Sequence, residues 1–95
     1  MPTLVLASAL ARWLPAAAGS EYRIDVEATN LHDALGSAFA QYPALRGYVL
    51  DEQGRIRHHV AVFIDGQALK DKSGLSAAAL GAHSEIYLLQ ALSGG

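Results

Sequence analysis

A change of hydrophobic period between two neighbouring segments constrains the fold of this sequence more than any other feature. Apolar and polar residues alternate in EYRIDVEA, residues 21–28, which is typical of a β-strand with one solvated face. From residue 31 the apolar spacing becomes i, i+3, i+4, i+7, i+8 and i+11, which predicts an amphipathic helix over Leu31–Tyr42. The apolar stripe of this helix consists of Leu31, Ala34, Leu35, Ala38, Phe39 and Tyr42.

The residues around the helical segment set its expected bounds. Asn30 is a favourable N-cap, and Asp33 brings a carboxylate to the first turn, where the helix dipole stabilises negative charge. Pro43 ends the helix, because proline donates no backbone hydrogen bond and restricts the residue before it. We expect Leu35 and Phe39 to lie in the core, because they are central in the apolar stripe.

Strand patterns lie on both sides of the helix. A continuous apolar run over Thr3–Leu10 predicts a first strand that forms a hairpin with residues 21–28. A third strand is predicted within HHVAVFI, residues 58–64, and the Asp-Gly pair that follows it predicts a tight turn. A short return strand at Gln67–Leu69 and a last strand at Glu85–Ala91 complete the pattern.

Together these segments predict an α+β protein. The order is strand, strand, helix, strand, short strand and strand, so we expect a mixed sheet with one main helix on one face. Weak helical turns are expected over residues 73–84. The chain has 95 residues, of which 52% are hydrophobic and 17% charged, enough for one folded core. We expect one domain over residues 1–91 and a flexible tail over residues 92–95.

The composition excludes several classes of function. The sequence has no cysteine, so disulfides, thiolate catalysis and zinc–sulfur sites are excluded. The net charge is −2 and the seven Lys and Arg residues form no basic run, so nucleic-acid binding is not expected. His58 and His59 are adjacent in an expected strand and would point to opposite faces, so they would not chelate one metal together. We expect no metal site.

The first twenty residues contain an apolar stretch followed by Ala16–Ala18, a pattern that a cleaved signal peptide would share. The first basic residue, Arg12, follows the apolar stretch instead of preceding it. The stretch Leu4–Ala11 is also far too short to span a bilayer. We therefore favour a buried strand here, and expect a cytoplasmic protein that does not associate with membranes.

Three stretches together resemble the MoaD/ThiS family of sulfur carrier proteins, which have the ubiquitin-like β-grasp fold. The predicted helix and the residues after it read NLHDALGSAFAQYPALRG, the central strand reads VAVFIDG, and the last strand and ending read EIYLLQALSGG. Their order and their distance from the end of the sequence make the combination more specific than any one stretch. GAHSEI replaces the family's frequent Gly-Asp before the last strand, and Gln90 stands where proline is common, which leaves the subfamily open.

The resemblance implies a specific chemistry. An adenylating, ubiquitin-activating-like partner enzyme would use ATP to convert the α-carboxylate of Gly95 into an acyl-adenylate, and a sulfur donor would then give a thiocarboxylate. A sulfur-accepting synthase would take the sulfur for molybdopterin, thiamin, cysteine or other biosynthesis. The chain would be a co-substrate and not an enzyme, with no bound cofactor and no catalytic side chain.

The same resemblance leaves other functions open. The chain could be the small subunit of a molybdopterin synthase, or a ubiquitin-like modifier that is joined to lysines. A β-grasp domain whose final glycines are accidental is the remaining alternative. All of these share the sequence ending, so the sequence alone separates them poorly.

The residue types at the end of the sequence fit a terminus that enters a narrow nucleotide site. Gly94 and Gly95 have no Cβ, so they pass where a side chain would collide. With Leu92 and Ser93 they form a segment that reaches at most ~14 Å when extended. We predict that Leu92, Ser93 and Gly94 thread into the partner's site.

A partner surface is predicted on the second face of the sheet. Alternation assigns five strand residues to the helix side, namely Val60, Val62, Ile64, Ile86 and Leu88. It places Phe63, Tyr87 and Leu89 on the opposite face, next to the tail. These three side chains form either a partner-docking surface or a minor core beneath covering loops.

Overall fold

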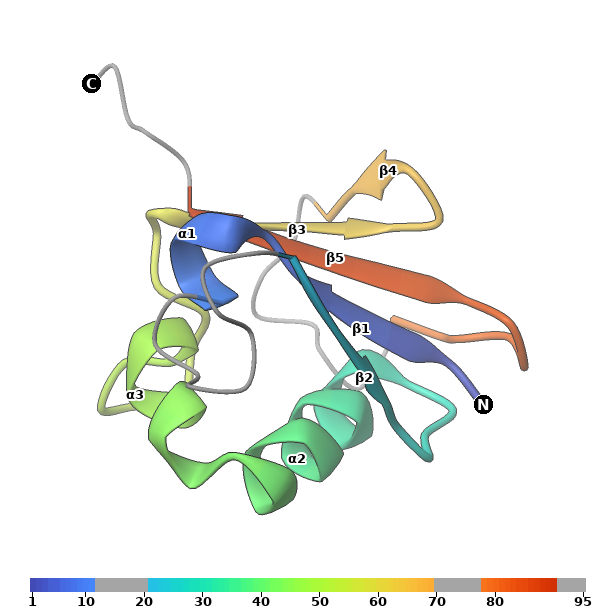
Figure 1. Cartoon of the computed structure of the whole chain (residues 1–95), viewed down its shortest axis with the longest axis horizontal. Coiled ribbons are helices and arrows are strands. Elements are labelled where there is room, and N and C mark those ends of the chain that lie inside the picture. The colour runs from blue at the N-terminus through green and yellow to red at the C-terminus, as the bar shows by residue number, and fades with distance from the viewer. Residues whose placement is uncertain (12–20, 70–77, 91–95) are drawn as a thin grey trace.

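The computed structural model describes residues 1–11, 21–69 and 78–90 as one sheet with helices against one of its faces (Figure 1). The elements follow the chain as β1 (Thr3–Leu6), α1 (Ser8–Ala11), β2 (Tyr22–Asp25), α2 (Leu31–Gln41), η2 (Pro43–Leu45), α3 (Arg46–Val49), β3 (Val60–Ile64), β4 (Gln67–Ala68) and β5 (Glu85–Gln90). The mixed α+β architecture predicted from the change of period is confirmed.

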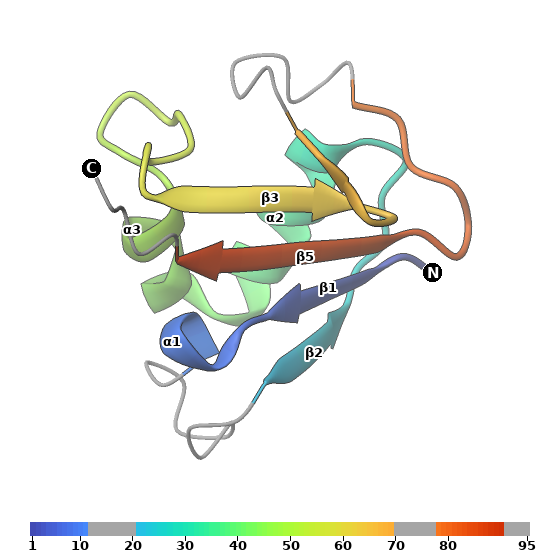
Figure 2. The same cartoon turned by 90° about the horizontal axis from the view of Figure 1, so that it is seen from above.

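The strands lie in the order β2-β1-β5-β3-β4 (Figure 2). The central pair, β1 and β5, is parallel, whereas β1 with β2, β3 with β5 and β3 with β4 are antiparallel. The first and last strands therefore lie side by side in the middle of the sheet. The expected hairpin between the first two strands is confirmed, with Leu4 opposite Ile24.

The main helix forms where its capping residues predict it. The Asn30 side-chain oxygen accepts a hydrogen bond from the Asp33 backbone N–H at 2.8 Å, and this satisfies one of the free donors of the first turn. The helix ends at Gln41, and Tyr42 is its C-cap residue. The stripe that α2 buries consists of Leu31, Ala34, Leu35 and Ala38.

The core lies between this stripe and one face of the sheet. The sheet contributes Leu4, Leu6, Ile24, Val60, Val62, Ile86 and Leu88. Two expected core residues, Phe39 and Ile64, are only half-buried at the margin of this cluster. Phe39 lies at the edge of the helical stripe and lines an open pocket, while Ile64 is the last residue of β3.

The expected first strand over Thr3–Leu10 is too long. β1 ends at Leu6, and the next residues form the helical turn α1, in which the Ala11 N–H donates to the Ala7 carbonyl at 2.8 Å. Leu10 and Ala11 are buried in the core on the helix side. A continuous apolar run fits a buried strand and a buried helical turn equally well, so periodicity could not place this boundary.

The turn after β3 has the predicted two-residue form. Asp65 and Gly66 have φ angles of 51° and 84°, the positive values that tight hairpin turns require. Of the helical turns expected over residues 73–84, only 78–84 are described, and these contain no helix. There Ala79 forms an isolated bridge with Asn30.

Within the described ranges, no helix combines the length and the hydropathy that crossing a bilayer requires.

Candidate functional site

The face of the sheet opposite α2, here called the outer face, carries the predicted partner surface. Phe63 pairs with Tyr87, and Ala61 with Leu89, across β3 and β5. Directly paired residues point to the same face, and their neighbour Val62 is buried on the helix side. Alternation therefore assigned these side chains to the correct face.

The three predicted partner-surface residues form a continuous group but are not fully exposed. Phe63, Tyr87 and Leu89 are each half-buried. Their docking role stays a prediction.

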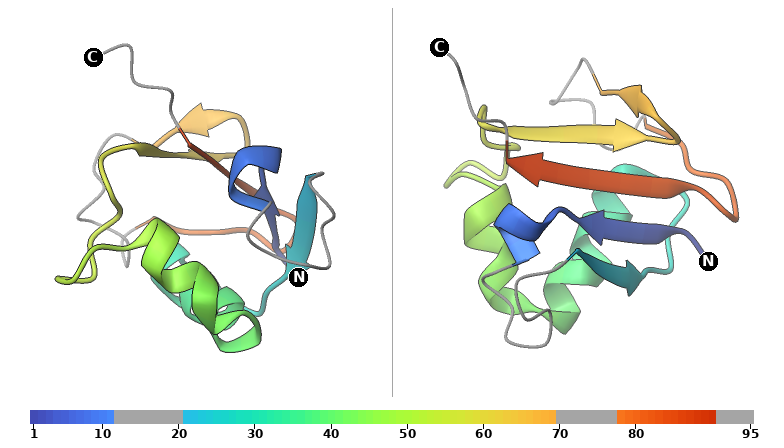
Figure 3. Two further views of the ribbon diagram at one scale, coloured as in Figure 1. Left: turned by 60° about the vertical axis from the view of Figure 1, so that its left-hand side comes forward. Right: turned by 45° about the horizontal axis from the view of Figure 1, so that its top comes forward.

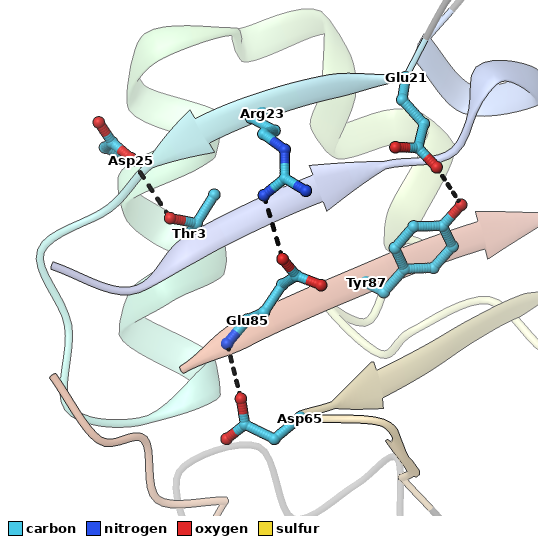
Figure 4. Close-up of polar contacts among 7 residues, drawn as sticks. All are labelled: Thr3, Glu21, Arg23, Asp25, Asp65, Glu85 and Tyr87. Carbon is cyan, nitrogen blue, oxygen red and sulfur yellow. Dashed lines mark hydrogen bonds and ion pairs between the residues drawn. The ribbon is translucent and has the colours of Figure 1, made fainter. Parts of the chain in front are cut away.

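A pair of polar contacts, here called the polar bridge, covers the other half of the outer face (Figure 4). Arg23 Nη1 donates to Glu85 Oε2 at 3.0 Å, and Tyr87 Oη donates to Glu21 Oε2 at 2.7 Å. Since β1 lies between β2 and β5, both contacts span β1. Beneath them Val5 is only 1% exposed, although it lies outside the core cluster on the helix side.

The polar bridge fixes positions more than it adds stability. The Arg23 and Glu85 side chains are 61% and 49% exposed, and ion pairs of this kind contribute about 0–1 kcal/mol. The hydrogen bond to Glu21 is the main cause that raises the pKa of the Tyr87 phenol, followed by desolvation and nearby carboxylates. Tyr87 therefore remains a neutral donor, and its ring is held between the polar and apolar halves of the face.

The start of β5 is anchored to the end of β3. Asp65 accepts hydrogen bonds from the Glu85 backbone N–H at 2.9 Å and from Ser84 Oγ at 3.0 Å. Ser84 Oγ in turn accepts from the Gly81 N–H at 2.8 Å. These contacts fix the central strand that leads towards the end of the sequence.

The other end of β5 lies beside α1 and the start of β3 (Figure 3). Gln90, the last residue of β5, pairs with Val60, and the Ala7 N–H donates to the Leu88 carbonyl at 2.9 Å. Gln90, the last described residue, thus lies at the end of a strand in the middle of the sheet. The predicted threading and attachment residues lie outside the described residues, namely Leu92, Ser93, Gly94 and Gly95.

The expectation that the two adjacent histidines lie in a strand and point to opposite faces was wrong. His58 and His59 lie in the turn before β3, where the Val60 N–H donates to the Arg57 carbonyl at 2.9 Å. Their rings pack edge to face with centroids 5.6 Å apart. In the part of the chain that the structure describes, no group of three or more potential ligands could hold a metal ion.

Sequence reasoning missed the polar bridge. The alternating pattern of residues 21–28 does place Arg23 on a solvated face, which was the available signal. Its contact with Glu85 depends on strand order and register between segments 62 positions apart. Neither quantity is encoded locally in the sequence.

The strand order, the parallel central pair and the helix α2 across one face define a β-grasp, the fold of ubiquitin-like proteins. No protein-family model and no curated protein matches the sequence. Solved structures do match it. SAMP1 from Haloferax volcanii is 30% identical, with a TM-score of 0.72 over 99% of this chain and 98% of that one.

Two further structures extend this similarity. The small archaeal modifier protein 1 of Methanosarcina acetivorans is 26% identical, with a TM-score of 0.71 over 99% of this chain and 95% of that one. CysO of Amycolatopsis orientalis, in its complex with BexX, is 14% identical and has the same fold, with a TM-score of 0.76 over 100% of both chains. The protein belongs to the MoaD/ThiS family of ubiquitin-like sulfur carrier and modifier proteins.

Proposed function

We propose that this protein is a sulfur carrier whose Gly95 α-carboxylate is adenylated and then converted to a thiocarboxylate. Its family membership carries the proposal, because the match to SAMP1 spans 99% of the chain, whose sequence ends in Gly94-Gly95. The rooted end of β5 supports it, because a fixed strand limits where the following residues can reach. The sulfur would serve cofactor or cysteine biosynthesis in the cytoplasm.

The chemistry takes place on the main chain. A carboxylate oxygen of Gly95 attacks the α-phosphorus of ATP in the partner's site, and pyrophosphate leaves. A sulfur nucleophile then attacks the carbonyl carbon of the acyl-adenylate, and AMP leaves with the electrons of the broken bond. This chain supplies the carboxylate and a slender approach through Gly94, while ATP stays with the partner enzyme. The protein therefore acts as a co-substrate and not as an enzyme.

Docking would use the apolar half of the outer face. Leu89 directly precedes Gln90 on β5, and Phe63 lies on the neighbouring strand β3, where it pairs with Tyr87. An adenylating enzyme, and later a sulfur-accepting synthase, would cover this surface while holding the terminus. The crystallised complex of CysO with BexX gives one example of a protein with this fold that binds a partner.

A second candidate is a protein modifier joined through Gly95 to lysine side chains. The similarity to SAMP1 of Haloferax volcanii, a small archaeal modifier protein that is 30% identical to this chain, favours it. Both candidates share the adenylation step. They differ in the nucleophile that attacks the acyl-adenylate, which is sulfur for a carrier and a lysine amine for a modifier.

The test uses the 95-residue chain with ATP and the cognate adenylating enzyme, with intact-mass spectrometry as the readout. We expect an acyl-adenylate at Gly95 and, when a sulfur donor is added, a product about 16 Da heavier than the unmodified chain, because one carboxylate oxygen is replaced by sulfur. Isopeptide-linked peptides on lysines would identify the modifier instead.

Two variants examine the role of the terminus. Deleting Gly95 should abolish the product, and replacing Gly94 with Trp should slow its formation while the circular dichroism of the fold stays unchanged. Modification of the deletion variant at the parent rate would contradict the proposal, as would a parent chain that never reacts.

A further inference from the structure

A pocket lies on the helix side of the molecule, away from the outer face. It measures about 190 Å³ and lies between α2 and the segment that runs from α3 to the turn at Gly54. Its lining residues are His32, Leu35, Gly36, Phe39, Arg46, Leu50 and Gly54. No step of the proposed sulfur chemistry uses this pocket.

The size of the pocket suits one large side chain. A cavity on the order of 150 Å³ holds a benzene ring, whereas sites for whole small-molecule ligands measure roughly 300–1,000 Å³. Phe39 and Leu50 provide apolar walls, and Phe39 is half-buried because it faces this space. The pocket therefore fits an aromatic or large aliphatic side chain better than a complete metabolite.

The charged residues of the lining indicate which partner group we expect beside that side chain. Arg46 lines the pocket, and its guanidinium forms no hydrogen bond or ion pair with another described residue. His32, also in the lining, already has the Asp33 carboxylate at 3.3 Å. Arg46 is thus the cation that a partner's carboxylate would meet, with a planar fork of donors suited to that group.

Gly36 provides an independent observation. It lies inside α2, where glycine is less favourable than alanine, yet a Cβ built on it would have no atom within 4 Å. Neither close packing nor a positive φ angle requires glycine at this position. Its effect is to leave the pocket open along the helix.

We propose that this pocket docks one aromatic or large aliphatic side chain of a partner protein, whose neighbouring carboxylate pairs with Arg46. The pocket and the outer face lie on opposite sides of the sheet. A partner that docks here leaves the predicted adenylating-enzyme surface and the end of β5 accessible.

The test uses capped dipeptides as probes, titrated into the ¹⁵N-labelled full chain and followed by backbone amide shifts. Acetyl-phenylalanyl-aspartyl amide should give saturable shifts in the amides of the pocket lining. The asparaginyl analogue should bind about two- to fivefold more weakly, because it loses the ion pair, and the glycyl-aspartyl analogue should give no saturable shift. Arg46→Gln should remove the difference between the first two probes.

A matched pair of glycine variants locates the site. Gly36→Met should fill the pocket and abolish the shifts, whereas Gly47→Met should leave them unchanged. Gly47 is also helical and open to an added Cβ, but it does not line the pocket. The proposal is overturned if folded Gly36→Met binds like the parent, if the shifts map to the outer face, or if free phenylacetate binds as tightly as the peptide.

Discussion

Asp51 organises the turn that carries Gly54 to the rim of the pocket. Its Oδ1 atom accepts hydrogen bonds from the Gln53 and Arg55 backbone N–H groups, both at 2.9 Å. The bond from Arg55 is the main cause that lowers the pKa of this carboxyl group, although desolvation opposes it. The ionised form of Asp51 is therefore the form that holds the turn.

This shift predicts a dependence of stability on pH. A carboxyl group whose pKa is lower in the folded state contributes stability that is complete above its unfolded value, near 3.8, and is lost as the pH falls through the folded value. Asp51→Asn removes this contribution. The parent should exceed the variant in free energy of unfolding most clearly near neutral pH, and the difference should shrink as the pH falls below about 4.

Urea unfolding of both proteins between roughly pH 2 and pH 7 measures this difference. Glu52→Gln is the matched control, because Glu52 lies in the same turn without a side-chain hydrogen bond to a described residue. A difference between parent and Asp51→Asn that stays constant over the whole range would contradict the prediction.

At the scale of elements, the sequence predicted those features that depend on interactions between residues close together in the chain. The N-cap at Asn30 and the positive φ angles at Asp65-Gly66 depend on residues within a few positions, and both were predictable. The end of β1 was not predictable from local signals. The burial of Leu10 by distant parts of the chain decides whether the residues after Leu6 form a strand or a helical turn. The face of Phe63 followed from alternation, while the polar bridge and the pocket depend on register and tertiary packing.

Two glycines in different elements should respond to alanine in opposite ways. Gly36→Ala should raise the free energy of unfolding by about 0.5–1 kcal/mol, since alanine is the better helix former and its Cβ meets nothing within 4 Å. Gly54→Ala should lower it by about 1–2 kcal/mol, since Gly54 has a φ angle of 78° that strains any residue with a Cβ.

Chemical denaturation of the parent and both variants under one set of conditions measures these changes. The opposite signs matter more than the sizes, because each variant serves as the control for the other. Loss of stability in Gly36→Ala would mean that the surface of α2 at this position is packed, which contradicts the open pocket.

At the scale of the whole molecule, the sheet separates two surfaces with different tasks. Its helix side holds almost all of the buried apolar residues, so charged substitutions there should unfold the protein. Its outer face has a polar bridge over β1 and an apolar half over β3 and β5. Leu89, in the apolar half, directly precedes Gln90 at the end of β5.

This division predicts that neighbouring substitutions on β3 have different effects. Phe63→Asp should weaken binding of the cognate adenylating enzyme about tenfold or more while the fold persists, because a half-buried apolar contact with the partner is replaced by a charge. Leu89→Asp should act in the same way. Val62→Asp should unfold the domain, since Val62 is 1% exposed on the helix side.

Calorimetric titration with the enzyme, together with thermal unfolding of each variant, separates these outcomes. Ala44→Asp is the surface control, because Ala44 is exposed in η2. This variant should bind the enzyme like the parent. If Phe63→Asp and Leu89→Asp unfold the domain as Val62→Asp does, the outer face is a second covered core. If they stay folded and bind like the parent, the partner docks elsewhere, and the rooted end of β5 alone must guide Gly95 to the nucleotide.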